Sequence, residues 1–120
     1  MSETFFFDTY ALFEIIRGNP NYAQYKNKKA IITIFNLAEF NYNLKKEHTK
    51  GIADKISGEY KQSVVKVSFN DITEAMDMKS KNRHLSIPDV IGYAVAKRLN
   101  IKFLTGDKEF ANLQNVEFVK

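Results

Sequence analysis

Several residue types are scarce or missing in this chain. Its 120 residues include no cysteine and no tryptophan, two prolines and two histidines. Without cysteine, neither a disulfide nor a thiolate metal site can form, and the separation of His48 from His84 argues against a histidine zinc site. No apolar run reaches the roughly 20 residues of a membrane span. The N-terminal residues 1–4 lack the basic segment and cleavage pattern of a signal peptide. These absences predict a cytoplasmic protein with no membrane contact.

The composition is that of a folded domain. Apolar residues make up 44% of the chain, and ten phenylalanines and six tyrosines provide bulky core material. The chain has no internal repeat and no linker rich in proline or glycine, and Pro20 and Pro88 both fall where helices are expected to begin. We therefore expect residues 1–120 to form a single domain.

Hydrophobic patterns predict alternating strands and helices. The predicted strands are residues 4–7, 30–34, 64–67, 102–105 and 116–119. The predicted helices are residues 9–17, 21–26, 35–47, 50–60, 71–82, 88–99 and 108–113, with Asn70 as the N-cap of the fifth. Strands separated by helices form parallel sheets covered on both faces, so the expected class is α/β.

Four acidic residues fall at related places in this pattern. Asp8 follows the first strand, Glu39 lies in the helix after the second, Asp89 follows Pro88 at a helix start, and Asp107 follows the strand 102–105. In a parallel α/β sheet these places converge outside the carboxyl ends of the strands. Carboxylates brought together repel one another, so the cluster predicts a hard cation, Mg²⁺ or Mn²⁺.

Each acid also has an ordinary structural explanation. Asp8 and Asp107 are suited to cap the helices that follow them, and Asp89 is favoured by the helix dipole in a first turn. Glu39 could be a partly exposed helix residue. Four such coincidences are much less probable than any single one, so the sequence favours a common site.

The charge balance is consistent with such a site. The net charge is +4, from 18 basic and 14 acidic residues. With four acids in one cleft, 18 basic residues face only ten other acids, which suits binding of a polyanion around a pocket that holds a cation. Ordinary solubility charge is the alternative explanation. Tyr22, Tyr25 and Tyr42 lie near basic residues and could stack on bases.

The order and spacing of these acids resemble a known family. The most specific parts are Leu85–Ile91, which contains Pro88-Asp89, and Phe103–Phe110, which contains Thr105-Gly106-Asp107 and ends in Phe110. Together with Asp8 and Glu39, these motifs resemble the PIN-domain nucleases over essentially the whole chain. The similarity is greatest to the VapC-type toxin ribonucleases of bacteria and archaea.

The resemblance implies a three-layer α/β/α fold with a five-stranded parallel sheet and Mg²⁺- or Mn²⁺-dependent cleavage of RNA phosphodiesters. It implies that Asp8, Glu39, Asp89 and Asp107 are the catalytic metal ligands and that Thr105 hydrogen-bonds a carboxylate or a metal-bound water. Asp107 is the least constant of these positions in the family, and Glu109 could be a further acid. The family's toxins commonly form homodimers and are held inactive by a cognate antitoxin; the segment 35–60 is the expected location of one or both surfaces.

Other functions are also compatible with these residues. A PIN-fold nuclease of RNA processing or decay would need the same residues without acting as a toxin. A magnesium-dependent phosphotransfer or phosphohydrolase domain also uses an aspartate after the first strand, although Asp8-Thr9-Tyr10 lacks the second acid of haloacid dehalogenase phosphatases. A non-catalytic RNA-binding module would usually have lost one of the four acids, and all four are present.

Overall fold

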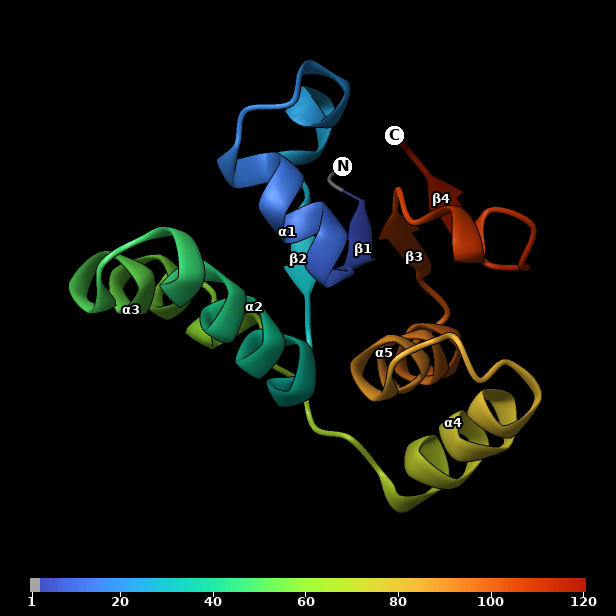
Figure 1. Ribbon diagram of the computed structural model, residues 1–120. Helices are drawn as coiled ribbons and strands as arrows, with labels where there is room; N and C mark the ends of the chain where they lie inside the picture. Colours follow the sequence, from blue (N-terminus) through green and yellow to red (C-terminus); the bar gives the residue numbers. More distant parts are fainter. Residues whose placement is uncertain (1–2) are drawn as a thin grey trace.

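The protein is built on a parallel four-stranded β-sheet (Figure 1). A computed structural model describes residues 3–120; Met1 and Ser2, part of the segment expected to lack signal-peptide character, lie outside the described residues. The strands are Thr4–Phe7 (β1), Lys29–Ile31 (β2), Lys102–Thr105 (β3) and Val116–Phe118 (β4). They lie in the order β2-β1-β3-β4, and every neighbouring pair is parallel. The central strands β1 and β3 therefore end side by side at one edge.

Helices cover both faces of this sheet. The α-helices are Thr9–Ile16 (α1), Ile34–Glu47 (α2), Lys50–Gly58 (α3), Phe69–Lys81 (α4) and Ile87–Arg98 (α5), and the 3₁₀ helices are Pro20–Tyr25 (η1), Lys61–Ser63 (η2) and Lys108–Phe110 (η3). Alternate residues of β1 point to opposite faces. Phe5 and Phe7 pack in the core cluster formed with α1, α2 and α3, whereas Phe6 packs in the cluster formed with α4 and α5. Within residues 3–120, no helix is both long and apolar enough to cross a membrane.

The prediction of a fifth strand was wrong. Residues 64–67 contribute only an isolated parallel bridge between Val64 and Ile32. The reason lies in the flanking helices. The Thr33 side chain caps α2, so β2 ends at Ile31 and leaves one residue, Ile32, to pair with residues 64–67. The Ser68 side chain then caps α4 immediately after the segment. Apolar, β-branched residues are present, but the neighbouring strand is too short to pair with them.

Ser68, rather than the predicted Asn70, is the N-cap of α4. Its hydroxyl accepts a hydrogen bond from the Asp71 backbone N–H at 3.0 Å, and the Asp71 carboxylate accepts one from the Ser68 N–H at 2.9 Å. This reciprocal capping box satisfies two N–H groups of the helix terminus at once. Asn70 lies in the first turn instead.

Helix α5 lies unusually close to the sheet. A Cβ atom added at Gly92 would lie 2.6 Å from the Phe6 ring and 3.3 Å from the Phe103 ring. These two rings stack with their centroids 5.5 Å apart and their planes 12° apart. The missing side chain thus lets α5 rest directly on the rings, which fixes its N-terminal turn near the carboxyl ends of β1 and β3.

Candidate active site

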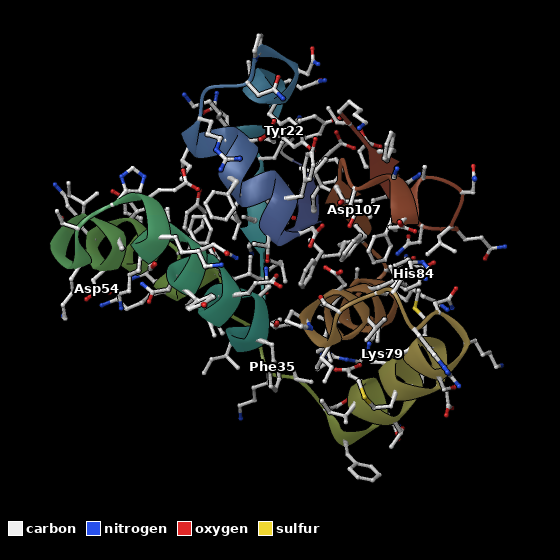
Figure 2. The ribbon with its side chains drawn as sticks, viewed as in Figure 1. Tyr22, Phe35, Asp54, Lys79, His84 and Asp107 are labelled. Atoms are coloured by element: carbon white, nitrogen blue, oxygen red, sulfur yellow. The ribbon has the colours of Figure 1, made fainter. Side chains whose placement is uncertain are left out.

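A pocket of about 340 Å³ opens beside the carboxyl ends of the central strands. All four predicted acids line it: Asp8, Glu39, Asp89 and Asp107. They come from the end of β1, from α2, from the first turn of α5 and from the segment after β3, which are separate parts of the chain. In Figure 2, Asp107 lies at the end of β3, between α1 and the start of η3. The structure therefore brings together the residues that the sequence places far apart.

Asp8 is the most enclosed of the four acids. Its side chain is only 4% exposed, and its Oδ1 accepts a hydrogen bond from the Thr9 backbone N–H at 2.7 Å, which caps α1. Its Oδ2 accepts a hydrogen bond from the Thr105 hydroxyl, also at 2.7 Å. The Asp8 backbone N–H donates to the Leu104 carbonyl at 3.1 Å, which joins the end of β1 to β3. Both carboxylate oxygens are therefore held in place.

Thr105 connects Asp8 to Asp107. It is fully buried at the end of β3, and its hydroxyl oxygen accepts a hydrogen bond from the Asp107 backbone N–H at 3.0 Å while its proton is donated to Asp8. Asp107 in turn caps η3, since its Oδ1 accepts from the Glu109 N–H at 3.0 Å. A single hydroxyl thus sets the position of one acid and the backbone of another.

The remaining two acids are positioned by helix starts. Asp89 forms a capping box with Ser86, with both hydrogen bonds at 3.2 Å. In α2, the Asn36 amide donates to the Phe7 carbonyl at 3.0 Å, which fixes the first turn of that helix to the end of β1. Glu39 lies one turn further on and lines the pocket.

The aspartates therefore serve both roles considered for them. Asp8 and Asp107 cap α1 and η3, and Asp89 belongs to the capping box of α5, as their structural explanations predict. The same three carboxylates line one pocket with Glu39. Capping fixes each carboxylate at a helix start, and the parallel topology places those helix starts together. The structural and functional explanations are compatible.

The electrostatics of the pocket favour a bound cation. Burial and the nearby Asp89 charge raise the pKa of Asp8 well above its ordinary value, against the hydrogen bonds from Thr105 and Thr9. Burial and the charge of Asp107 raise the pKa of Asp89, against its hydrogen bonds with Ser86. These shifts mean that ionising the acids together is unfavourable without a nearby positive charge. A cation among them would reverse the shifts.

Glu39 and Thr9 face the same region. Burial, and then the charge of Asp89, raise the pKa of Glu39, and the nearby Thr9 hydroxyl opposes this rise. Thr9 Oγ1 is nevertheless buried and makes no hydrogen bond of good geometry with any residue of the range 3–120.

The donor set fits Mg²⁺ or Mn²⁺ in chemistry. Four carboxylates supply hard oxygen atoms, and no sulfur or imidazole lines the pocket. As placed, no three acidic or histidine side chains in the described range 3–120 stand close enough to hold one metal ion together. Binding would therefore require some of the carboxylates to turn toward a shared point.

The pocket also contains residues that the sequence analysis missed. Tyr10, Phe13, Glu14 and Arg17 of α1 and its C-cap line it, and Asn43 of α2 lies opposite. Counted from Tyr10, these residues follow at intervals of three, four and seven and so share one face of the helix, which was a usable signal. Their type did not indicate a function, because such residues are common on exposed helix faces.

Several further sequence expectations can be compared with the structure. Tyr22 and Tyr25 are buried, with hydroxyls that donate to the Val119 carbonyl and to Glu117, both at 2.6 Å, so they are not base-stacking platforms. Tyr42 is 65% exposed. The Glu109 carboxylate lies 3.0 Å from His84 and is not among the pocket-lining residues.

Comparisons with known proteins agree with this architecture. The family model for the PIN domain matches residues 5–116. Among curated proteins, none matches this sequence. A solved structure titled as a toxin-antitoxin complex from Klebsiella pneumoniae is similar with a TM-score of 0.73 and 20% identity, covering 94% of this chain and 95% of that chain. PAE2754 from Pyrobaculum aerophilum is similar with a TM-score of 0.72 and 18% identity, covering 98% and 92%. At these identities the two structures show the fold alone, and the family assignment rests on the sequence match: this chain belongs to the PIN domain family.

Proposed function

We propose that this protein is an endoribonuclease that uses Mg²⁺ or Mn²⁺ to cleave RNA phosphodiester bonds, with residues 1–120 acting as one nuclease domain. The observation that carries the proposal is the convergence of Asp8, Glu39, Asp89 and Asp107 on one pocket beside the carboxyl ends of β1 and β3. PIN domains are generally nucleases, and membership of this chain in that family supports the same reaction class.

The residues divide the work as follows. Asp8 and Asp89 would bind the cation directly, Glu39 would bind it or its water, and Asp107 would complete the site or hold a second cation. The cation would neutralise phosphate charge and lower the pKa of an attacking water, so no side-chain nucleophile is required. Thr105 would keep Asp8 oriented through its 2.7 Å hydrogen bond. Asp8 would release its proton as the cation binds, because its raised pKa arises from burial and from Asp89.

The first test is cleavage of a mixed pool of transfer and ribosomal RNA. The wild type would be assayed with Mg²⁺, with Mn²⁺ and with EDTA beside Asp89→Asn, which keeps the side-chain shape and removes one ligand charge. Asp77→Asn is the matched control, because Asp77 is exposed on α4 and does not line the pocket. We expect cutting that requires metal, persists in Asp77→Asn and falls by at least about a hundredfold in Asp89→Asn.

RNA binding and phosphorylation, measured beside cleavage, separate the alternatives. RNA binding without cutting in either metal would support a non-catalytic RNA-binding module. Phosphorylation of Asp8 by a small phosphodonor would support a phosphotransfer domain. Cutting that survives EDTA or Asp89→Asn would contradict the metal-dependent mechanism.

We further propose that the protein is the toxin of a toxin–antitoxin pair. The support is the family and the shared fold with the Klebsiella pneumoniae complex. A cognate antitoxin with an arginine or lysine directed into the pocket would pair with the carboxylates there. Induced expression in a bacterial host tests this: wild type should arrest growth, and Asp89→Asn should not. Growth unaffected by an enzyme that cleaves RNA in vitro would instead favour a role in RNA processing or decay.

A homodimer is part of this proposal. Ile34, Phe35, Tyr42 and Ile52 are large side chains of α2 and α3 that are between 39% and 65% exposed. They fall within or beside the segment 35–60 that the sequence suggested as a contact surface. Light scattering after gel filtration should give twice the mass of 13.9 kDa for wild type and a smaller mass for Ile52→Glu. A monomeric wild type would contradict the homodimer.

A further inference from the structure

Arg17 is the basic residue among the pocket-lining residues of the described chain. It is the C-cap of α1, and two acids and an aromatic ring hold its guanidinium. Its Nη2 donates to Glu47 at 3.1 Å, its Nη1 lies 3.5 Å from Glu14, and its central carbon lies 4.8 Å from the centroid of the Phe13 ring. These contacts hold the guanidinium at the margin of the pocket.

Glu14, one of the two acids that contact Arg17, is itself held in place. Glu14 is only 19% exposed, and its other oxygen accepts a hydrogen bond from the Asn19 amide at 2.8 Å. The Arg17 side chain remains 52% exposed. A guanidinium has five N–H donors, and the only side-chain hydrogen bond that this one makes within residues 3–120 is to Glu47. It can therefore bind another anion without leaving its place.

Arg17 and Asp8 lie at opposite ends of α1. Asp8 precedes α1 and Arg17 follows it, a separation of nine residues that corresponds to a rise of about 13 Å. Helices α1 and α2 lie against each other (Figure 1). Glu39 and Asn43 of α2 line the pocket together with residues of α1. The acid cluster thus lies at the β-strand end of the pocket, and the basic side chain that lines it, paired with Glu14 and Glu47, lies at the end of α1.

We propose that Arg17 is a positioning residue that binds a phosphate flanking the scissile one in a bound RNA strand. The proposal rests on the proposed ribonuclease function and deepens it. A strand with its scissile phosphate at the carboxylates runs along the pocket between α1 and α2 and places a neighbouring phosphate at the guanidinium. The planar fork of arginine suits this contact because it can bind two phosphate oxygens at once.

The kinetic test compares a long and a short substrate. An oligoribonucleotide has flanking phosphates, whereas bis(p-nitrophenyl) phosphate has one phosphate alone. For Arg17→Gln we expect kcat/KM on the oligoribonucleotide to fall about tenfold, mainly through KM, with no change on the small diester. Arg17→Lys keeps the charge without the fork and should show an intermediate loss. Lys102→Gln is the control, because Lys102 is exposed at the amino end of β3, away from the pocket.

A binding test needs neither metal nor cutting. The affinity of each protein for a single-stranded oligoribonucleotide is measured in EDTA at several salt concentrations. The logarithm of the RNA association constant falls as the logarithm of the salt concentration rises. This fall should be less steep by about 0.7 in Arg17→Gln than in Lys102→Gln, as expected for loss of one phosphate contact. Thermal unfolding of each variant shows whether its fold is intact.

The outcomes are distinct. Equal losses of kcat/KM on both substrates would place Arg17 at the scissile phosphate or in a purely structural role, and would overturn the proposal. An unchanged salt slope would overturn it as well. A wild type that cuts no substrate would contradict the ribonuclease function, whereas the salt slope would still decide whether Arg17 contacts a phosphate.

Discussion

Replacing Thr105 with valine removes the hydroxyl that connects Asp8 and Asp107 and keeps the branched shape of the side chain. Thr105 is fully buried, donates to the Asp8 carboxylate at 2.7 Å and accepts from the Asp107 N–H at 3.0 Å. Valine suits a β-strand, so the backbone of β3 should be undisturbed. The change therefore isolates two hydrogen bonds.

The expected cost follows from these contacts. The hydrogen bond to Asp8 contributes about 0.5–1.5 kcal/mol when that carboxyl is protonated and about 1.5–3 kcal/mol when it is ionised, and the Asp107 N–H, which is partly buried, would lose its partner at a cost of about 1 kcal/mol. We expect Thr105→Val to lower the free energy of unfolding by about 1.5–4 kcal/mol. Thr105→Ser keeps the hydroxyl and should lose about 1 kcal/mol, for one methyl group.

The same change should weaken metal binding. The Thr105 hydrogen bond lowers the pKa of Asp8, so its loss should raise that pKa further and make the proton harder for a cation to displace. Urea unfolding in EDTA measures the stability of each variant, and the shift of the midpoint with added Mn²⁺ measures binding. A valine variant as stable as the serine variant, with the same response to Mn²⁺, would refute the proposed connection.

Three further predictions follow from the pKa shifts and the packing. In EDTA, the raised pKa of Asp8 means that the folded protein keeps a proton that the unfolded chain releases above its ordinary pKa of 3.8. The contribution of Asp8 to the free energy of unfolding should therefore fall as pH rises from 3.8 through the raised value. Saturating Mn²⁺ should remove that fall. Gly92→Ala should destabilise the protein by about 1–2 kcal/mol despite the better helix propensity of alanine, because the added Cβ would meet the stacked rings beneath α5. Gly51→Ala, whose added Cβ would meet open space, should be neutral or stabilising. Chemical denaturation of both variants checks this. Asp71→Asn should lower the free energy of unfolding by about 1–3 kcal/mol, because Arg98 donates to both Asp71 oxygens at 3.0 Å. Since the pKa of Asp71 is lowered, this stabilisation should be present above pH 3.8 and disappear as pH falls through the lowered value. Equal losses of stability in wild type and variant during an acid titration would contradict this.

Local sequence signals predicted most of the secondary structure. The strand Thr4–Phe7 and the strand Lys102–Thr105 have the predicted bounds, because continuous apolar runs between helices are typical of buried parallel strands. The error at residues 64–67 has a tertiary origin: pairing depends on the neighbour, and β2 ends at Ile31. The error at Asn70 was avoidable, because Ser68 followed three residues later by Asp71 is a capping-box signal.

The acid cluster was predictable, and the rest of the pocket was not. Parallel topology alone brings Asp8, Asp89 and Asp107 together, because each follows a strand or begins a helix at the same edge of the sheet. Arg17 gave no comparable signal, because its place depends on contacts with Glu14 and Glu47, and Glu47 lies 30 residues away in sequence. The catalytic roles of the four acids and the positioning role of Arg17 are predictions that the assays above test.

The sequence by itself determined the alternation of strands and helices, the helix caps and the places of the four acids relative to the strand and helix ends. These features depend on periodicity and on short-range hydrogen bonds. Only the tertiary structure decided the number of strands, the burial of Tyr22 and Tyr25, the connection of Asp8 to Asp107 through Thr105 and the position of Arg17. Each of these depends on residues brought together by packing, which no local pattern records.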